Sequence, residues 1–180
     1  LCNLAVPGAG PRLHFFDNVD PHSLEALLAA LDLPRTGFLI VSKSGSTAET
    51  MSVFLICLAA MQGAVGATAA GRHFTAITEP ADNVLRRSCA AHGIEIFDHD
   101  PGVGGRYSVL SLVGLLPAMI AGLDAVAVRQ GAAEVLAAVL DGAPPDRVEP
   151  AIGAAIAIGL AQENGCSSTV LMPYIDRLAD

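Results

Sequence analysis

A hydroxyl-rich segment is the part of this 180-residue sequence best suited to bind an anion. Residues 42–50 read SKSGSTAET, which places four hydroxyl side chains and a lysine within six positions, between a continuous apolar run and a helical pattern. Free N–H groups at a helix start point towards an anion, and the helix dipole favours negative charge there. Gly45 lets the backbone approach closely. The pattern predicts a phosphate site at the carboxyl end of a strand, where open α/β sheets bind ligands.

Helix capping is the alternative role for the same hydroxyls. Ser46 and Glu49 have the spacing of a capping box, in which the glutamate supports the start of the helix. We therefore do not assign Glu49 as a general base, although proton transfer would need one. The number of hydroxyls favours anion binding over capping alone. The sequence lacks the nucleotide-binding pattern G-x-x-x-x-G-K-[ST], so nothing in it supports nucleoside triphosphate hydrolysis.

A second glycine-rich loop, DPGVGGRYS at residues 100–108, carries Arg106. A guanidinium held in such a loop could stabilise an oxyanion that develops during a reaction. Arg106 could instead be a structural arginine that pairs with Asp98 or Asp100, and spacing alone leaves both possibilities open. Ser108 is expected to cap the helix that follows.

Metal binding and nucleic-acid binding find no support in the composition. The four cysteines are far apart without a C-x-x-C pair, and the five histidines have no metal-ligand spacing, so we predict no metal site. The net charge of −8 and the ten dispersed Lys and Arg residues argue against a nucleic-acid or anionic-membrane surface. Reduced cysteines and the lack of a visible signal peptide favour a cytoplasmic protein.

The apolar stretch from Tyr107 to Val128 approaches the length of a membrane span. Pro117 and Asp124 interrupt it, and no Lys/Arg-rich flank would set a topology. We expect two buried helices that break near Gly122, with no membrane partner.

Short β-rich runs alternate with longer helical ones, a pattern that builds a parallel sheet covered by helices. The apolar run from Phe38 to Ser42 predicts a central strand buried on both faces. The other expected strands are residues 13–17, 73–78, 94–97 and 169–172, and the expected helices include residues 21–31, 47–62, 81–91 and 149–163. Asp20 and Pro21 form a helix start. The fold class is α/β, a parallel sheet of about five strands flanked by helices on both faces, in a single domain over residues 1–180.

Four segments in sequence order resemble the glucose-6-phosphate isomerase family of bacteria. They are HFFDNVDP at 14–21, SKSGSTAET at 42–50, GVGGRYSVLSLVGLLPAMIAGLD at 102–124 and VLMPYIDRL at 170–178. The second resembles the phosphate-binding signature of the sugar isomerase (SIS) domain of these enzymes. The resemblance implies an αβα sandwich of the SIS type and an aldose–ketose isomerisation of glycolysis and gluconeogenesis without a cofactor.

The resemblance also implies roles for particular residues. Ser42, Ser44 and Thr47 would bind the sugar phosphate through their hydroxyls, while Lys43 would contribute mainly its backbone amide. In the second loop, Gly105 and Arg106 would lie beside C1 and C2 of the substrate, and Arg106 would stabilise the cis-enediolate.

By the same resemblance, the chain is expected to be truncated at both ends. A Gly-Gly-Ser loop would precede Leu1, and the catalytic glutamate and the ring-opening histidine and lysine would follow Asp180. We expect residues 1–180 alone to be inactive, and the full-length protein to be a homodimer. Alternatives are a bifunctional phosphoglucose/phosphomannose isomerase, a non-catalytic SIS-domain sugar-phosphate sensor, and an interaction role for a fragment with an exposed apolar face.

Overall fold

The computed structural model describes residues 10–170 and Met172, which group into two compact units. The α/β unit comprises residues 12–116 and holds every predicted site residue. The helical unit comprises the described part of residues 1–11 and 117–180. The expected single domain stays a prediction.

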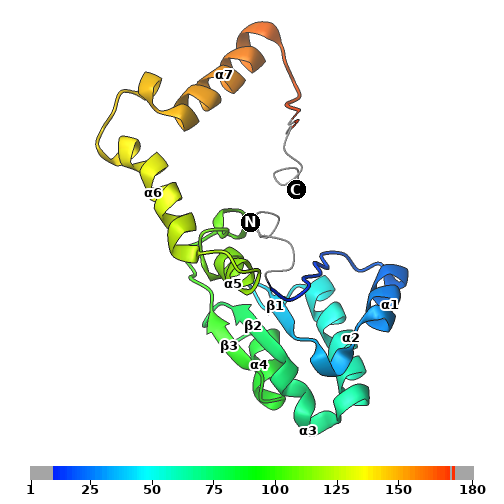
Figure 1. Ribbon diagram of the computed structural model, residues 1–180. Helices are drawn as coiled ribbons and strands as arrows, with labels where there is room; N and C mark the ends of the chain where they lie inside the picture. The colour runs from blue at the N-terminus through cyan, green and yellow to red at the C-terminus, as the bar shows by residue number, and fades with distance from the viewer. Residues whose placement is uncertain (1–9, 171, 173–180) are drawn as a thin grey trace. The chain divides into compact units, whose positions relative to one another are not determined.

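The α/β unit is built on three parallel strands, β1 (Phe38–Val41), β2 (Phe74–Thr78) and β3 (Glu95–Asp98), which lie side by side in Figure 1. β2 pairs with both neighbours, with Phe38 opposite Phe74 and Thr75 opposite Glu95. The α/β class and these three strands are confirmed. The prediction that 38–42 is the central strand is wrong for the described sheet, because β2 occupies that position and β1 pairs on one side only.

Two further predicted strands are wrong. Residues 13–17 have no regular structure, and Phe15 is 68% exposed. Thr169, Val170 and Met172 also lie outside any strand, while residue 171 falls outside the described part of the chain. A strand gains its hydrogen bonds only from a neighbouring strand, so β-favouring residues alone do not form one. The five-strand sheet is therefore corrected to three strands among the described residues.

Seven helices are described, together with short 3₁₀ turns. They are α1 (Pro21–Ala30), α2 (Ala48–Val65), α3 (Ala67–Ala70), α4 (Val84–Ala91), α5 (Leu112–Ile120), α6 (Ala125–Leu140) and α7 (Glu149–Asn164). Asp20 caps α1 as predicted, accepting a hydrogen bond from Ser23 N at 2.9 Å. Asp124 caps α6, so the predicted break between two helices is confirmed. The prediction that both helices are buried is wrong for α6, which has no buried residue and whose Leu140 is 76% exposed, because an apolar helix is buried only where another element covers it.

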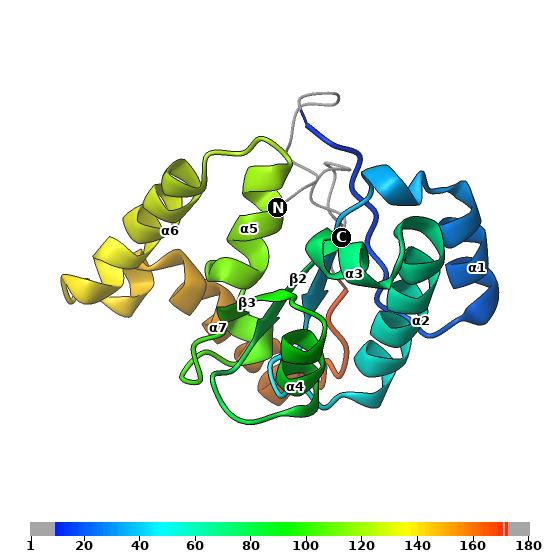
Figure 2. The ribbon, with the colours of Figure 1, turned by 90° about the horizontal axis from the view of Figure 1, so that it is seen from below.

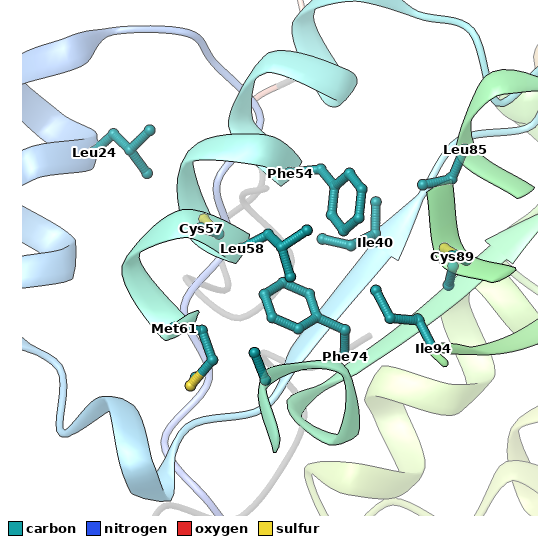
Figure 3. Packing of buried hydrophobic residues seen from close by; sticks show 12 residues of the cluster. Leu24, Ile40, Phe54, Cys57, Leu58, Met61, Phe74, Leu85, Cys89 and Ile94 are labelled. Carbon is teal, nitrogen blue, oxygen red and sulfur yellow. The ribbon is translucent and has the colours of Figure 1, made fainter. Parts of the chain in front are cut away.

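The core of the α/β unit lies between one face of the sheet and helices α1, α2 and α4 (Figure 3). Side chains alternate between the two faces of a strand, so Ile40 and Ala76 share this face with Phe74. Phe74 stacks on Phe38 at a ring-centroid distance of 4.9 Å and meets Phe54 of α2 edge-on at 5.8 Å. This packing fixes α2 against the sheet through Phe54. Helical cover on the second face stays a prediction.

α1 and α2 lie side by side at the edge of this core (Figure 2). Among the described helices, only α2 is long and apolar enough to cross a membrane by length and composition, which is weak evidence by itself. Its side chains Phe54, Cys57, Leu58 and Met61 are buried in the core cluster. α2 is accordingly a core helix of the α/β unit.

The helical unit contains α6 and α7, joined by a linker with a 3₁₀ turn at Pro145–Arg147. α7 begins at Glu149, as predicted. α7 ends at Gly165 in the left-handed conformation (φ +67°), a common helix stop.

Candidate phosphate and oxyanion site

Three of the predicted phosphate-binding hydroxyls converge in the segment between β1 and α2, which we name the hydroxyl loop (residues 42–47). Ser42 is buried, and its Oγ lies 3.5 Å from Thr47 Oγ1. Ser44 Oγ lies 3.5 Å from the same Thr47 oxygen. Hydroxyl hydrogen bonds are normally 2.5–3.0 Å long, so these contacts are weak and leave capacity for a ligand. The loop therefore presents a cluster of hydroxyls at the start of a helix.

The start of α2 differs from the predicted capping box. The helix begins at Ala48 with Thr47 as N-cap, and Thr47 makes no side-chain cap hydrogen bond. Ser46 Oγ donates instead to Ser44 O at 3.3 Å. Glu49 is exposed in the first turn. The capping prediction is wrong because the loop turns the hydroxyls of residues 42, 44 and 47 towards one another, so they remain available to an anion.

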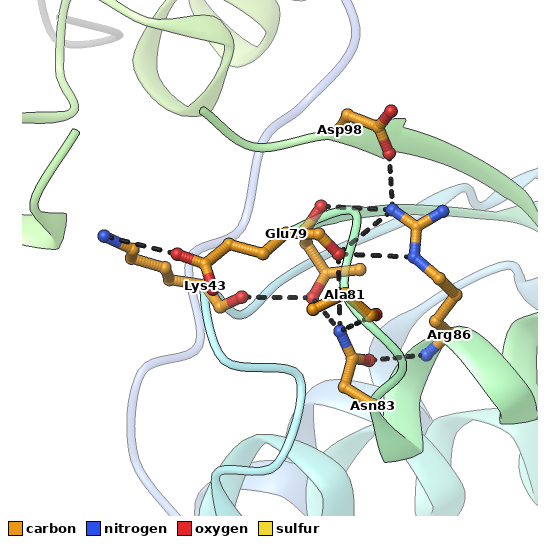
Figure 4. A network of polar contacts seen from close by, with 7 residues as sticks. Lys43, Glu79, Ala81, Asn83, Arg86 and Asp98 are labelled. Carbon is orange, nitrogen blue, oxygen red and sulfur yellow. Dashed lines mark hydrogen bonds and ion pairs between the residues drawn. The ribbon is translucent and has the colours of Figure 1, made fainter. Parts of the chain in front are cut away.

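Asn83, which was not predicted from the sequence, supports the hydroxyl loop by packing against Gly45. Gly45 has φ +62°, and a Cβ at that position would overlap the Asn83 carboxamide, with Nδ2 only 2.7 Å away. The buried Asn83 side chain accepts a hydrogen bond from Arg86 N at 2.8 Å and donates to Thr78 Oγ1 at 3.1 Å (Figure 4). Leu85 N donates to Gly45 O at 2.9 Å. The first turn of α4 thus fixes the backbone of the loop.

A signal for Asn83 exists in the sequence. Asn is among the favoured N-cap residues, and Asn83 stands immediately before the helix Val84–Ala91. That assignment would place the residue at a helix start. It would not place it against Gly45, because this contact joins two segments that the fold brings together.

The Lys43 side chain is bound within the protein. Its Nζ donates to Pro101 O at 3.0 Å and to Val103 O at 2.9 Å, and it lies 3.3 Å from Glu79 Oε1. The Lys43 carbonyl accepts hydrogen bonds from Glu79 N at 3.0 Å and Thr78 Oγ1 at 3.2 Å. The ammonium group is therefore engaged by three protein oxygens, which leaves the backbone amide as the group available to a phosphate.

Arg106 lies in a 3₁₀ turn, Gly105–Tyr107, and its side chain is exposed. The two carboxylates considered as structural partners are otherwise engaged. Asp98 pairs with Arg86, and Asp100 Oδ1 accepts from Gly102 N at 2.8 Å. Arg106 makes no hydrogen bond or ion pair with the described residues. Its guanidinium is thus free to meet a ligand.

The expected cap at Ser108 is not formed. Ser108 Oγ donates back to Gly105 O at 2.7 Å, and α5 begins only at Leu112. The difference arises because the chain completes a turn at Gly105–Tyr107 before the helix starts. Ser108 therefore stabilises the loop that carries Arg106.

No cluster of three or more His, Cys, Asp or Glu residues that could hold a metal ion occurs among the described residues. Cys57 and Cys89 are buried, and burial raises the pKa of both thiols, that of Cys89 to about 11. Thiols with raised pKa values are poor nucleophiles at neutral pH. Both cysteines belong to the core.

The family described as phosphoglucose isomerase matches residues 4–180. The chain belongs to this family. It is 38% identical over 177 residues to the glucose-6-phosphate isomerase of Rubrobacter xylanophilus, covering 98% of this chain and 40% of that protein. It is 40% identical over 124 residues to a glucose-6-phosphate isomerase of Thermus thermophilus, covering 69% of this chain and 30% of that protein.

A solved structure agrees with this assignment. The crystal structure of a hypothetical protein from Thermus thermophilus matches 88% of this chain and 37% of its own length, with a TM-score of 0.75 and 35% identity. The chain thus spans about two fifths or less of the proteins it matches. The resemblance stated from the four sequence segments is confirmed.

Proposed function

We propose that the complete protein interconverts glucose 6-phosphate and fructose 6-phosphate, and that residues 1–180 supply phosphate binding and oxyanion stabilisation. The observation that carries the proposal is the convergence of the Ser42, Ser44 and Thr47 hydroxyls at the start of α2. Membership of the phosphoglucose isomerase family supports the choice of substrate.

The proposed chemistry divides between two loops. The hydroxyls, the Lys43 amide and the N–H groups that open α2 bind the dianionic phosphate, because donors and the helix dipole all favour negative charge there. Isomerisation moves a proton between C2 and C1 through an enediolate. The exposed Arg106 guanidinium, with the Gly105 backbone beside it, stabilises the charge that develops on that intermediate.

A coupled assay of fructose 6-phosphate conversion in the complete protein tests this function. Arg106→Ala is expected to lower kcat by about 10²- to 10³-fold, the usual effect of removing one oxyanion donor. Arg87→Ala is the matched control, since Arg87 lies on α4 and forms an exposed ion pair with Asp82, at 2.7 Å. Equal activity of wild type and Arg106→Ala would contradict the role of Arg106.

Two further measurements separate the alternatives. Turnover of mannose 6-phosphate would assign the bifunctional isomerase, and binding of fructose 6-phosphate without turnover would assign a sensor. Residues 1–180 expressed alone are expected to show no turnover, because loss of a general base typically costs about 10²- to 10⁴-fold in rate. Measurable turnover by this segment would place the general base within residues 1–180, with Glu49 as the candidate.

The family consists of soluble glycolytic enzymes that are typically cytoplasmic. We extend this to a cytoplasmic, homodimeric complete protein that acts without a cofactor. Size-exclusion chromatography with light scattering tests the dimer, and a monomeric complete protein would contradict it.

A further inference from the structure

The Lys43 side chain joins the two loops of the proposed site. Lys43 lies in the hydroxyl loop, while its acceptors Pro101 and Val103 lie in the second loop, three to five positions before Arg106. Hydrogen bonds from an ammonium to oxygen are about twice as strong as those between neutral groups. The side chain is only 34% exposed, so solvent competes with these bonds less than at an open surface.

Glu79 orients the lysine. Its Oε1 lies 3.3 Å from Lys43 Nζ, and its backbone N–H donates to Lys43 O, so the two residues are held at both the side chain and the main chain. Glu79 follows β2 directly, which anchors it to the central strand. Glu79 therefore holds Lys43 in place while its ammonium group contacts the second loop.

The loop that receives the lysine forms a compact turn. Val103 N donates to Asp100 O at 3.1 Å, and Gly102 N donates to Asp100 Oδ1 at 2.8 Å. Tyr107 N then donates to Gly104 O at 2.9 Å as the 3₁₀ turn begins. The turn over residues 100–103 is followed directly by the turn over residues 104–107, with no residue between them. Two carbonyls of the first turn bound by one ammonium therefore restrain where the second turn, which carries Arg106, begins.

We propose that Lys43 is a positioning residue whose ammonium, oriented by Glu79, holds the Arg106 loop in register with the hydroxyl loop. Phosphate binding and oxyanion stabilisation then act on the same substrate at a fixed separation. This inference rests on the proposed isomerase function. It differs from a role in which Lys43 merely adds positive charge near the phosphate.

A charge role and a positioning role for Lys43 affect different kinetic constants. In the complete protein, Lys43→Met is expected to lower kcat for fructose 6-phosphate by about 10- to 100-fold with a smaller change in KM, since small displacements of a catalytic group cost this much. Lys43→Arg, which can still donate to both carbonyls, is expected to recover part of kcat. A pure charge role predicts a raised KM with unchanged kcat.

Glu79→Gln sharpens the test. A pure charge role predicts a lower KM, because the variant removes a negative charge near the phosphate. The positioning role predicts a lower kcat instead, because the ammonium loses its charged partner. Arg87→Met is the control for losing an ion-paired cation elsewhere in the α/β unit.

Hydrogen exchange supplies a readout that does not depend on turnover. Lys43→Met is expected to speed amide exchange in peptides covering residues 100–107 several-fold, while Arg87→Met leaves it at the wild-type rate. If wild type lacks isomerase activity, the proposed function fails and the exchange result still decides whether Lys43 restrains the loop. Unchanged exchange in Lys43→Met, or an effect confined to KM, would overturn the positioning role.

Discussion

Replacing Gly45 with alanine tests whether Asn83 supports the hydroxyl loop. Gly45 has φ +62°, a conformation that disfavours any side chain, and a new Cβ would overlap the Asn83 carboxamide. Gly93 provides a matched control, because its φ is +64° and a Cβ there would meet nothing within 4 Å. The two substitutions share the positive φ, and only the one at the buried Gly45 brings a new Cβ against Asn83.

The magnitude follows from these two contributions. The left-handed conformation costs an alanine about 1–2 kcal/mol. To avoid the new Cβ, Asn83 must leave its bonds to Arg86 N and Thr78 Oγ1, and each bond contributes about 0.5–1.5 kcal/mol. We expect Gly93→Ala to lower the free energy of unfolding by about 1–2 kcal/mol and Gly45→Ala by about 2–5 kcal/mol.

Urea denaturation measures these differences in the free energy of unfolding. The proteins compared are the wild type, Gly45→Ala, Gly93→Ala, Asn83→Ala and the double variant Gly45→Ala/Asn83→Ala. Asn83→Ala removes the three atoms nearest to the new Cβ, so in that background Gly45→Ala should cost about as much as Gly93→Ala. The cycle thus isolates the clash as a coupling energy of about 1–3 kcal/mol. Equal costs for Gly45→Ala and Gly93→Ala in the wild-type background would refute the reasoning.

Three further predictions concern the core, the thiols and the hydroxyls. Phe54→Ala should lower the free energy of unfolding by about 3–5 kcal/mol in urea denaturation, because Phe54 is fully buried against Phe74, while exposed Leu55→Ala should cost far less. A thiol reagent at pH 8 should modify exposed Cys166 and leave Cys57 and Cys89 unmodified, because burial raises the pKa of both buried thiols; peptide mapping measures the modification. Labelling of Cys89 in the native protein would contradict its burial. Ser44→Ala should raise the KM for fructose 6-phosphate about 10- to 100-fold by removing a hydrogen bond to a charged group. Ser46→Ala should raise it less, since Ser46 Oγ already bonds to Ser44 O. Equal effects of the two substitutions would contradict a specific role of Ser44 in phosphate binding.

Local signals in the sequence predicted the elements that local interactions determine. Asp20 followed by Pro21 marked the start of α1, because a capping carboxylate bonds only to N–H groups two or three residues away. The continuous apolar run at 38–42 also predicted a strand from local information alone, because its short length and its residue types exclude a surface helix.

Pairing between segments could not be predicted in the same way. Residues 13–17 and 94–97 both carry β-favouring side chains, yet only the second segment pairs with another strand, over residues 95–98. The position of β1 at one side of the sheet also depends on where β2 and β3 run. The same limit hid the Lys43 side chain, whose acceptors Pro101 and Val103 lie far along the chain.

In the hydroxyl loop, the capping box that the local sequence predicts does not form. Ser46 and Glu49 have the spacing of a capping box, yet α2 begins after Thr47 without a side-chain cap. Omitting a cap typically costs a helix about 1 kcal/mol, and α2 can bear this because Phe54, Cys57, Leu58 and Met61 bury its inner face. Natural sequences depart from local preference mainly at functional sites. We therefore propose that the uncapped N–H groups and the three convergent hydroxyls act together as donors to a bound phosphate.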